Sequence, residues 1–429
     1  MITVFIGFLI LLMIMGVPVA FALGFTNLIA LILDRGIANI PYEVIAQRLV
    51  YALDNFPVLA VPFFLLAGKL MNVGGITDRI FNFVNCIVGY VRGGLGHVNV
   101  VASMIFAGMS GSATADAAGL GAIEIRALKQ AGYGQNFSIG ITASSAMIGT
   151  IIPPSIPMVL YAVLAEVSVA ELFLGGLIPG VLMGLSLMVL VIYFSIKNNY
   201  PKGSLPSWKE VYTSFLKASL ALLTPIIIID GIWGGIFTPT EAGAVSVFYA
   251  IFLACIFYRD LSFKGLVETM VDSMRDVAKI LFILSCGSFY GWLLIRFRIP
   301  YMLTDSILSV TTNPLGVLII INLFFLMVGC FLSTVVSITI FTPLIMPLIK
   351  QVGIDPIYFG VIMAFNLTLG NITPPFGMVL YVLAGVTRTS FPRVVRAVFP
   401  FLCALIGVLI LVILIPSLST YIPYNLMRR

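Results

Sequence analysis

One stretch of the chain, residues 108–154, recurs 221 residues later as residues 329–375. Without any gap, 11 of the 47 aligned pairs are identical, among them Gly108 with Gly329 and Pro153 with Pro374. Both copies place a small-residue or hydroxyl-rich kink inside apolar sequence and follow it with a Gly-x-Ile-x-Pro-Pro break. The chain therefore contains two copies of one structural plan.

The apolar character of the chain predicts its class. Of its 429 residues, 60% are hydrophobic and only 9% are charged, and long apolar runs occur throughout, which is typical of an all-α polytopic membrane protein. The net charge of +6 comes from Lys and Arg in short loops, which indicates a positive-inside topology and argues against nucleic-acid binding. We expect residues 1–33 to be a retained membrane segment that begins at Met1, in which residues 16–18 either kink one long helix, the interpretation we favour, or divide two shorter spans.

The repeated breaks indicate what the protein does. Interrupted backbone inside hydrocarbon leaves polar groups unsatisfied, so it is tolerated only where protein or a water-filled cavity surrounds it. Paired interruptions at corresponding places in two halves are typical of the substrate and ion sites of secondary transporters. The sequence therefore predicts a transporter whose binding cavity lies at the breaks.

The duplication predicts the domain organisation. The first repeat covers residues 1–196, with a re-entrant helical hairpin at 95–130 and a broken helix at 135–165. A polar linker with an interfacial helix, residues 197–218, carries four lysines. The second repeat covers residues 219–429, with its hairpin at 313–352 and its broken helix at 355–387. More basic residues border the first hairpin than the second, which favours two inverted repeats.

The breaks offer oxygen ligands for a small cation, from hydroxyl groups and from carbonyls at helix ends. We predict two sodium sites, one in each repeat. The first contains Ser110, Gly111, Ser112, Asp116, Gly149, Thr150 and Pro153; the second contains Ser333, Thr334, Ser337, Gly370, Asn371 and Thr373. The alternative for any single residue is that it only allows close helix packing, and for Asp116 that it caps a helix.

An anionic substrate is expected between the hairpin tips and the broken helices. The candidate substrate-binding residues are Ser112, Asp116, Ser155, Ser333, Asn366 and Pro375. Glu241 could also reach the cavity, but a capping role for Thr238 or Thr240 is the simpler interpretation.

Other functions have less support in the sequence. The breaks hold hydroxyls and amides and no chain of buried acids or histidines, so coupling to sodium is favoured over coupling to protons. No phosphate-binding loop is present, and no paired acids, metal cluster or nucleophile with a base indicates an enzyme or a cofactor. A gated organic-anion channel is the main alternative, because the same cavity could leak through.

Four motifs resemble one known family. GMSGSATADAAGLG, IIPPSIPMVLYA, GGIFTPTEAGAV and NITPPFGMVLYVLAG are similar to the large membrane subunit of tripartite ATP-independent periplasmic (TRAP) transporters, from Gly16 to about residue 400. The resemblance implies a sodium-driven importer of organic acids, such as C4-dicarboxylates or sialic acid, in the bacterial inner membrane. It also implies an elevator mechanism in which hairpins and broken helices move against a scaffold.

The resemblance further implies two protein partners. One is a small membrane subunit, expected here as a separate chain, and the other is a periplasmic substrate-binding protein. Carried onto this sequence, the family's sodium regions fall on residues 110–116 with 149–153, and on 333–337 with 370–373.

The hairpin tips provide a first test. Replacing Ser112 or Ser333 with a bulky residue is expected to abolish uptake, because the side chain would fill the tip, while the protein still folds in detergent. Uptake by purified protein in vesicles measures this. Unchanged transport in both variants would rule out the assignment of the binding sites to the hairpin tips.

Overall fold

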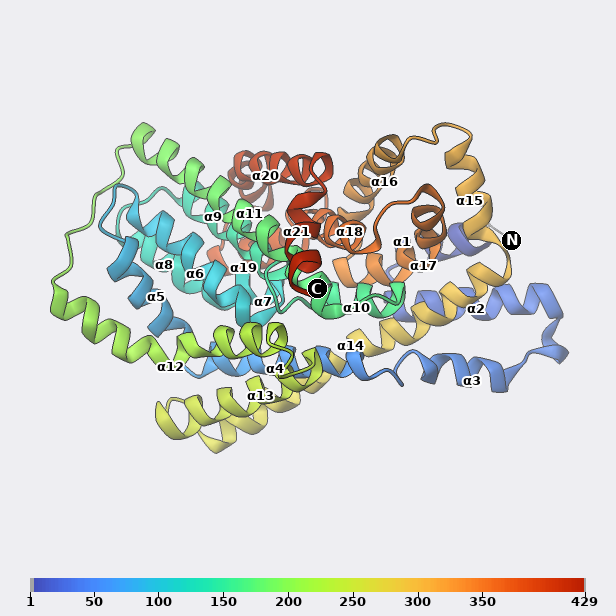
Figure 1. Ribbon diagram of the computed structural model, residues 1–429, viewed down its shortest axis with the longest axis horizontal. Helices are drawn as coiled ribbons and strands as arrows, with labels where there is room; N and C mark the ends of the chain where they lie inside the picture. Colours follow the sequence, from blue (N-terminus) through green and yellow to red (C-terminus); the bar gives the residue numbers. More distant parts are fainter. Residues whose placement is uncertain (1–3, 428–429) are drawn as a thin grey trace.

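The computed structural model describes residues 4–427. All regular secondary structure in this range is helical (Figure 1). Residues 1–3, which include the expected start at Met1, and residues 428–429 lie outside that part. Residues 4–427 form no β-strand and only one isolated bridge, between Arg92 and Lys202. Seven of the described helices are long and apolar enough to cross a membrane, so the predicted all-helical, multi-pass class is confirmed.

The N-terminal segment is divided, not kinked. A π-helical turn (η1, Val4–Phe8) and α1 (Leu9–Ile14) precede a break, after which α2 (Val19–Arg35) begins. Gly16 takes φ +82°, a left-handed conformation that ends a helix, and Pro18 has no N–H to continue one. The prediction of one kinked helix is therefore wrong.

Helices of the first half frame the first hairpin. The short turns η2 (Ile37–Asn39) and η3 (Phe56–Leu59) alternate with α3 (Tyr42–Tyr51), α4 (Ala60–Val73) and α5 (Ile76–Val88). The region of the first predicted hairpin forms α6 (Gly94–Ser110), α7 (Ala113–Ala118) and α8 (Leu120–Gln130). The following segment forms α9 (Gln135–Ser145), η4 (Ala146–Thr150), α10 (Ile156–Ala165) and the long α11 (Val169–Lys197).

The linker between the halves differs from its prediction. Residues 208–217, part of the linker with an interfacial helix predicted at 197–218, are the first turns of α12 (Trp208–Trp233), which continues into an apolar segment. Ser207 starts this helix with a capping box: its hydroxyl accepts from Glu210 N–H, and the Glu210 carboxylate accepts from Ser207 N–H at 2.7 Å. The polar sequence thus marks a helix start instead of an independent element.

Helix α13 in the second half also begins with a capping box. Thr238 and Glu241 form a capping box at α13 (Pro239–Ile251), so the capping interpretation of Glu241 is confirmed. Thr240 points elsewhere and donates to the Phe56 carbonyl at 2.9 Å. Then follow η5 (Phe252–Phe257), α14 (Phe263–Arg296) and α15 (Ile299–Leu308).

The second copy repeats the first. Its elements are α16 (Pro314–Gly329), α17 (Thr334–Val352), α18 (Pro356–Gly370) and α19 (Met378–Thr387), followed by α20 (Phe391–Leu414) and α21 (Ser417–Met427). Gly132 and Gly353, an identical pair of the duplication, both take positive φ just after α8 and α17. In each copy this glycine ends the hairpin helix where a residue with a Cβ would be strained.

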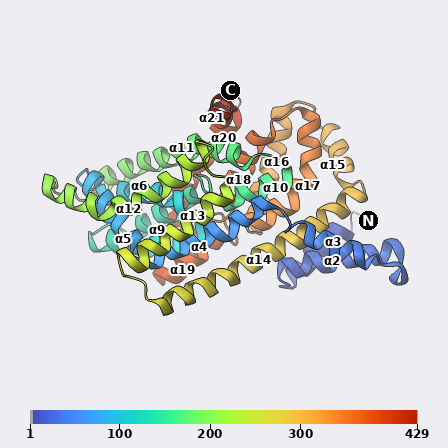
Figure 2. The same ribbon diagram turned by 60° about the horizontal axis from the view of Figure 1, so that its bottom comes forward.

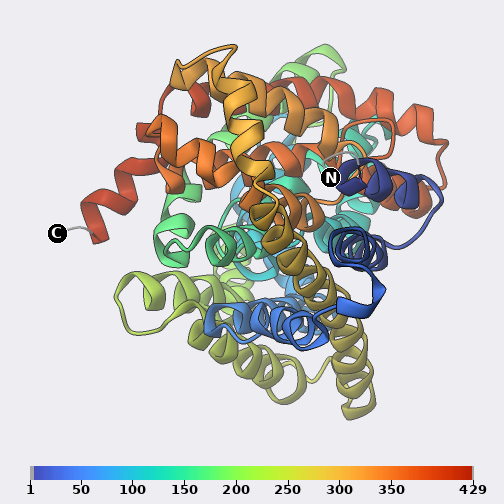
Figure 3. The ribbon, with the colours of Figure 1, turned by 90° about the vertical axis from the view of Figure 1, so that its right-hand side faces the viewer.

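Long helices of both halves enclose the two copies. Figure 2 shows α14 running along one edge of the molecule, where it packs against α2, α3, α4 and α17. Lys69 on α4 pairs with Asp276 on α14 at 2.5 Å, and Arg79 on α5 pairs with Asp260 at 2.6 Å. Figure 3 shows the C-terminal helix α21 reaching to one side; it packs on α11.

Close packing of α18 can be tested at Gly360. A Cβ there would overlap the Tyr161 ring and lie 2.8 Å from Leu172 Cδ1. The ring cannot move aside easily, because the Tyr161 hydroxyl donates to the Pro356 carbonyl at 2.8 Å. Gly360→Ala is therefore expected to destabilise the protein by about 1–3 kcal/mol.

The control for this variant is Gly407→Ala on α20, where a Cβ would meet nothing within 4 Å. Thermal unfolding in detergent should show a lower midpoint for Gly360→Ala and no loss for Gly407→Ala. Equal midpoints for the two variants would contradict the packing described here.

Candidate ion and substrate site at the repeated helix breaks

Both breaks follow helices that are buried almost entirely. In α18 every residue from Ile357 to Gly370 is buried, and in α9 residues 137–145 are buried. A helix that is apolar and covered on all sides belongs to the core of a large protein. The irregular backbone of the first break is therefore surrounded by protein, as a membrane environment requires, whereas residues 374–376 of the second break are exposed.

The first hairpin tip is a tight turn between α6 and α7. Gly111 takes φ +64° and ends α6, and a Cβ on it would lie 2.8 Å from the Pro154 carbonyl. Ser112 caps α7, with its hydroxyl accepting from Ala115 N–H. The backbone N–H of Ile156, beyond the break, donates to the Gly111 carbonyl at 3.4 Å. The tip and the first break are thus in direct contact.

Asp116 is the charged group of this site. Its carboxyl lies against Gly149, where an added Cβ would collide with Asp116 Oδ2 and lie 3.7 Å from Ser110 Oγ. Asp116 is only 3% exposed, and its Oδ1 has no hydrogen-bond partner among the described residues. The structure therefore brings Ser110, Asp116 and Gly149 together around an unsatisfied carboxyl oxygen.

The second tip is built from hydroxyl and amide groups. Ser333 caps α17, and the next residue, Thr334, donates to the Leu367 carbonyl at 3.2 Å. Asn371, in the second break, donates from Nδ2 to Thr334 Oγ1 at 3.1 Å. As in the first copy, the tip and the break are joined by hydrogen bonds.

Ser337 occupies the position in the second copy that Asp116 occupies in the first. Its side chain is fully buried, and its Oγ also lacks a hydrogen-bond partner within the described structure. Buried polar atoms are normally paired, so an orphan at the same place in both copies needs an explanation. A bound ligand that supplies the missing partner is one of the few physical explanations.

The copies differ in how the paired glycines pack. A Cβ on Gly370 would collide with the Gly329 backbone, so here two helices approach through glycine alone. Close packing therefore accounts for Gly370, whereas Gly149, its counterpart, leaves room for a carboxyl group.

The two copies hold each other reciprocally. Helix α7 of the first hairpin packs on α19, and its counterpart α17 packs on α10. Between the breaks, the hydroxyls of Thr150 and Thr368 lie 3.0 Å apart. This reciprocity is what a two-fold relation between the copies produces.

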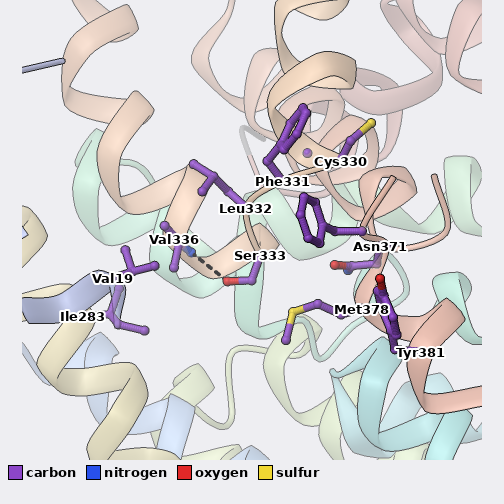
Figure 4. A pocket seen from close by; sticks show the side chains of 13 residues that line it. Val19, Ile283, Cys330, Phe331, Leu332, Ser333, Val336, Asn371, Met378 and Tyr381 are labelled. Carbon is purple, nitrogen blue, oxygen red and sulfur yellow. Dashed lines mark hydrogen bonds between the residues drawn. The ribbon is translucent and has the colours of Figure 1, made fainter. Parts of the chain in front are cut away.

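A cavity of about 390 Å³ lies beside the second tip and break (Figure 4). Ser333 and Asn371 supply its polar lining, and Tyr381 closes one side together with Phe331 and Phe376. Val19 of α2 and Ile283 of α14 complete the wall. The described lining residues include no carboxylate or basic side chain, and the volume suits a small organic ligand.

The N-termini of two helices border this cavity. Ser333 and Val336 bring the start of α17 to it, and Gly377 and Met378 bring the start of α19. No side chain caps α19. The Val379 N–H donates to the Asn371 carbonyl at 3.0 Å, so the attraction for an anion comes from the positive ends of the two helix dipoles and not from free N–H groups.

The other predicted substrate residues lie apart from this cavity. Ser155 is fully buried and donates to the Thr150 carbonyl at 2.5 Å, and Asn366 donates to Asn322 at 2.6 Å. Pro375 is exposed, and Pro153 is buried; each belongs to a cis Pro-Pro bond. Thr373 donates back to the Leu369 carbonyl at 2.7 Å. Among the predicted substrate residues, Ser333 lines the cavity.

Sequence reasoning missed one buried acid, Glu124 on α8. It is 1% exposed and lies among Asn99 and Ser103 of α6. The signal was available: Asn99 and Ser103 are four residues apart, and so lie on one face of an otherwise apolar helix. The aromatic side of the cavity, Phe376 and Tyr381, was also missed, because aromatic residues are common in membrane helices.

An all-helical apolar chain with paired interrupted helices around an anion-attracting cavity is a membrane transport protein. The sequence matches the family described as "Tripartite ATP-independent periplasmic transporter, DctM component" over residues 6–418. The chain belongs to this family, which confirms the resemblance seen in the motifs.

Three relatives span almost the whole chain. It is 43% identical to the sialic acid TRAP transporter large permease protein SiaM of Vibrio cholerae, with 95% of each chain covered. It is 38% identical to the 2,3-diketo-L-gulonate TRAP transporter large permease protein YiaN of Escherichia coli, with 94% of each covered. The C4-dicarboxylate TRAP transporter large permease protein DctM of Vibrio cholerae is 37% identical, with 97% of this chain and 96% of that protein covered.

A solved structure shares the fold. The Alcanivorax borkumensis YdaH transporter matches with a TM-score of 0.62 over 87% of this chain and 88% of that one. The sequences are only 14% identical, so this likeness concerns the fold alone.

The contact between the breaks can be tested by a double-mutant cycle. Thr150→Val leaves the buried Thr368 hydroxyl without a partner and is expected to cost about 1–3 kcal/mol. The double variant Thr150→Val with Thr368→Val removes both hydroxyls, so most of that stability should return. Thermal unfolding midpoints of the single and double variants measure this, and additive losses would contradict a direct bond.

Proposed function

We propose that this protein is the substrate-translocating subunit of a sodium-coupled importer of an organic acid anion in the bacterial inner membrane. One observation carries the proposal: Asp116 Oδ1 and Ser337 Oγ, at equivalent positions of the duplication, are buried oxygens without hydrogen-bond partners among residues 4–427. A sodium ion at each position would supply the missing partner, because hard cations bind carboxyl, hydroxyl and carbonyl oxygens.

The first sodium site is proposed around Asp116, with oxygens from Ser110, the tip turn and the break near Gly149. The second is proposed around Ser337, with oxygens from Thr334 and Asn371. The first site carries a negative charge and the second does not. The proposal therefore predicts two sodium ions of unequal affinity.

The substrate is proposed to bind in the cavity beside Ser333 and Asn371. Two helix N-termini border this cavity, which supports an anion, and its polar and aromatic lining suits a polyhydroxylated acid. The relatives are named as transporters of sialic acid, 2,3-diketo-L-gulonate and C4-dicarboxylates, so a sugar acid or a C4-dicarboxylate is the expected class.

The mechanism is proposed to be an elevator. Residues 1–196 and 219–429 are inverted repeats around the linker at 197–218, and their hairpins and broken helices move together. The reciprocal packing of α7 with α19 and of α10 with α17 supports one moving unit. Helices such as α4 and α14, joined by the Lys69–Asp276 pair, supply the scaffold.

Two partners complete the proposed system: a small membrane subunit and a soluble periplasmic protein that delivers the substrate. The family description as one component of a tripartite transporter supports both.

Uptake into proteoliposomes tests the function. The protein with its small subunit, supplied with a panel of labelled organic acids on their binding proteins, should accumulate one acid only under an inward sodium gradient. Flux that ignores sodium and stops at equilibrium would indicate a gated channel instead.

The two sodium sites can be separated by substitution. Asp116→Asn removes the only charge of the first site, so the sodium concentration for half-maximal uptake should rise about tenfold, equivalent to about 1.4 kcal/mol. Ser337→Ala should raise it less, because only a neutral ligand is lost. Wild-type sodium dependence in both variants would contradict the assignment.

A further inference from the structure

Glu124 lies at the centre of a buried polar cluster that the proposed ion and substrate sites do not use. Its carboxyl oxygen Oε2 accepts from Asn99 Nδ2 at 2.7 Å, and its Oε1 lies 3.4 Å from Ser103 Oγ. Ser103 Oγ lies 3.0 Å from Ser145 Oγ, which in turn donates to Asn99 Oδ1 at 2.8 Å. The four side chains form a closed ring, and each is at most 3% exposed.

Counting the protons of the ring shows which form of Glu124 completes it. A hydroxyl has one proton, so Ser103 can donate either to Glu124 or to Ser145, but not to both. If Glu124 is ionised, the four contacts of the ring share only three protons, so one contact has none. If Oε1 carries a proton, Glu124 donates to Ser103, Ser103 to Ser145, Ser145 to Asn99 and Asn99 to Glu124. Every donor then has one acceptor.

The charges around Glu124 do not stabilise an ionised form. Helix α8 packs against α6, α7 and α9. The titratable side chains of these helices are His97 on α6 and Asp116 on α7, and α9 has none. Arg126 and Lys129 on α8 itself form no ion pair with Glu124 within the described structure. A buried carboxylate without a cation is expensive, and Asp116 nearby adds repulsion when ionised.

A sodium ion fits this ring less well than a proton. Asn99 directs its amide N–H groups at Glu124 Oε2 and at Thr142 Oγ1, both at 2.7 Å, so a cation there would face positive hydrogens. Breaking those contacts would leave the amide unpaired in the core.

We propose that Glu124 is a proton-binding site, with a proton from solvent held on Oε1 and the ring closed through Ser103, Ser145 and Asn99. The site belongs to the first copy alone. Three of the four counterparts in the second copy are apolar, and the fourth is an amide: Ile320, Phe324, Ile345 and Asn366. The proton is therefore separate from the duplicated sites assigned to sodium.

Infrared spectroscopy of the full-length protein in lipid nanodiscs at neutral pH tests this proposal. The carbonyl stretch of a protonated carboxylic acid is resolved from that of a carboxylate, and it shifts in D₂O. Wild type should show this band at neutral pH, where an exposed glutamate is ionised. In Glu124→Gln the part of the band due to Glu124 should disappear.

The matched control is Glu268→Gln on α14, whose carboxylate is 66% exposed and should contribute no such band. A band of equal size in wild type and Glu124→Gln would overturn the proposal. So would a band at Glu124 that appears only after sodium is removed, which would mean that a cation occupies the ring.

Stability gives an independent measurement. Glutamine can donate to Ser103 and accept from Asn99, as the protonated acid does, so Glu124→Gln should keep the wild-type thermal midpoint. Glu124→Ala should lower the midpoint, since it opens the ring. If Glu124→Gln is destabilised as much as Glu124→Ala, the ring requires an ionised carboxylate and the proposal fails.

Discussion

The structure depends on one constraint: a backbone interrupted inside a membrane must have its polar groups satisfied by protein. The chain meets it by covering α9 and α18 on nearly all sides, so that the first break lies in the core and the second begins there, before residues 374–376 reach the surface. Each hairpin tip then supplies hydrogen-bonding groups to a break, through Gly111 in the first copy and Thr334 in the second. The same enclosure excludes lipid from any ligand bound there.

Within this common plan the two copies differ in chemistry. The position of Asp116 is a serine in the second copy, and the room that Gly149 leaves for a carboxyl is filled by backbone contact at Gly370. Of the four residues of the ring around Glu124, three are replaced by apolar side chains and Ser145 is replaced by Asn366. The two copies thus share a backbone plan, while the fully buried acidic side chains of this region, Asp116 and Glu124, belong to the first copy.

Much of the fold could be predicted because the signals were local or periodic. The gapless repeat, the Pro-Pro breaks and the apolar runs indicated helices at the places where the structure has them. The division at residues 16–18 was the less favoured of two interpretations and the continuity of α12 was missed, because a proline or a polar run can either end a helix or begin one. Only the surrounding packing decides between these outcomes.

The site was harder to predict, because its residues meet through tertiary contacts. Ser333 and Asn371 share the cavity with Val19 and Ile283, which no spacing rule connects. The hydroxyl and amide residues of the breaks also serve the fold: Ser155 caps α10, and Asn366 bonds Asn322. Residue type alone cannot separate those roles from ligand binding.

The position of the cavity bears on how the duplicated plan can work. It touches the tip and break of the second copy, and its wall is completed by α2 and α14, which lie outside the duplicated core. At the first tip Gly111 contacts residues 154–156. In the proposed inverted arrangement the two tips face opposite sides of the membrane. The cavity beside the second tip then gives the proposed mechanism a binding place next to one of these two tips.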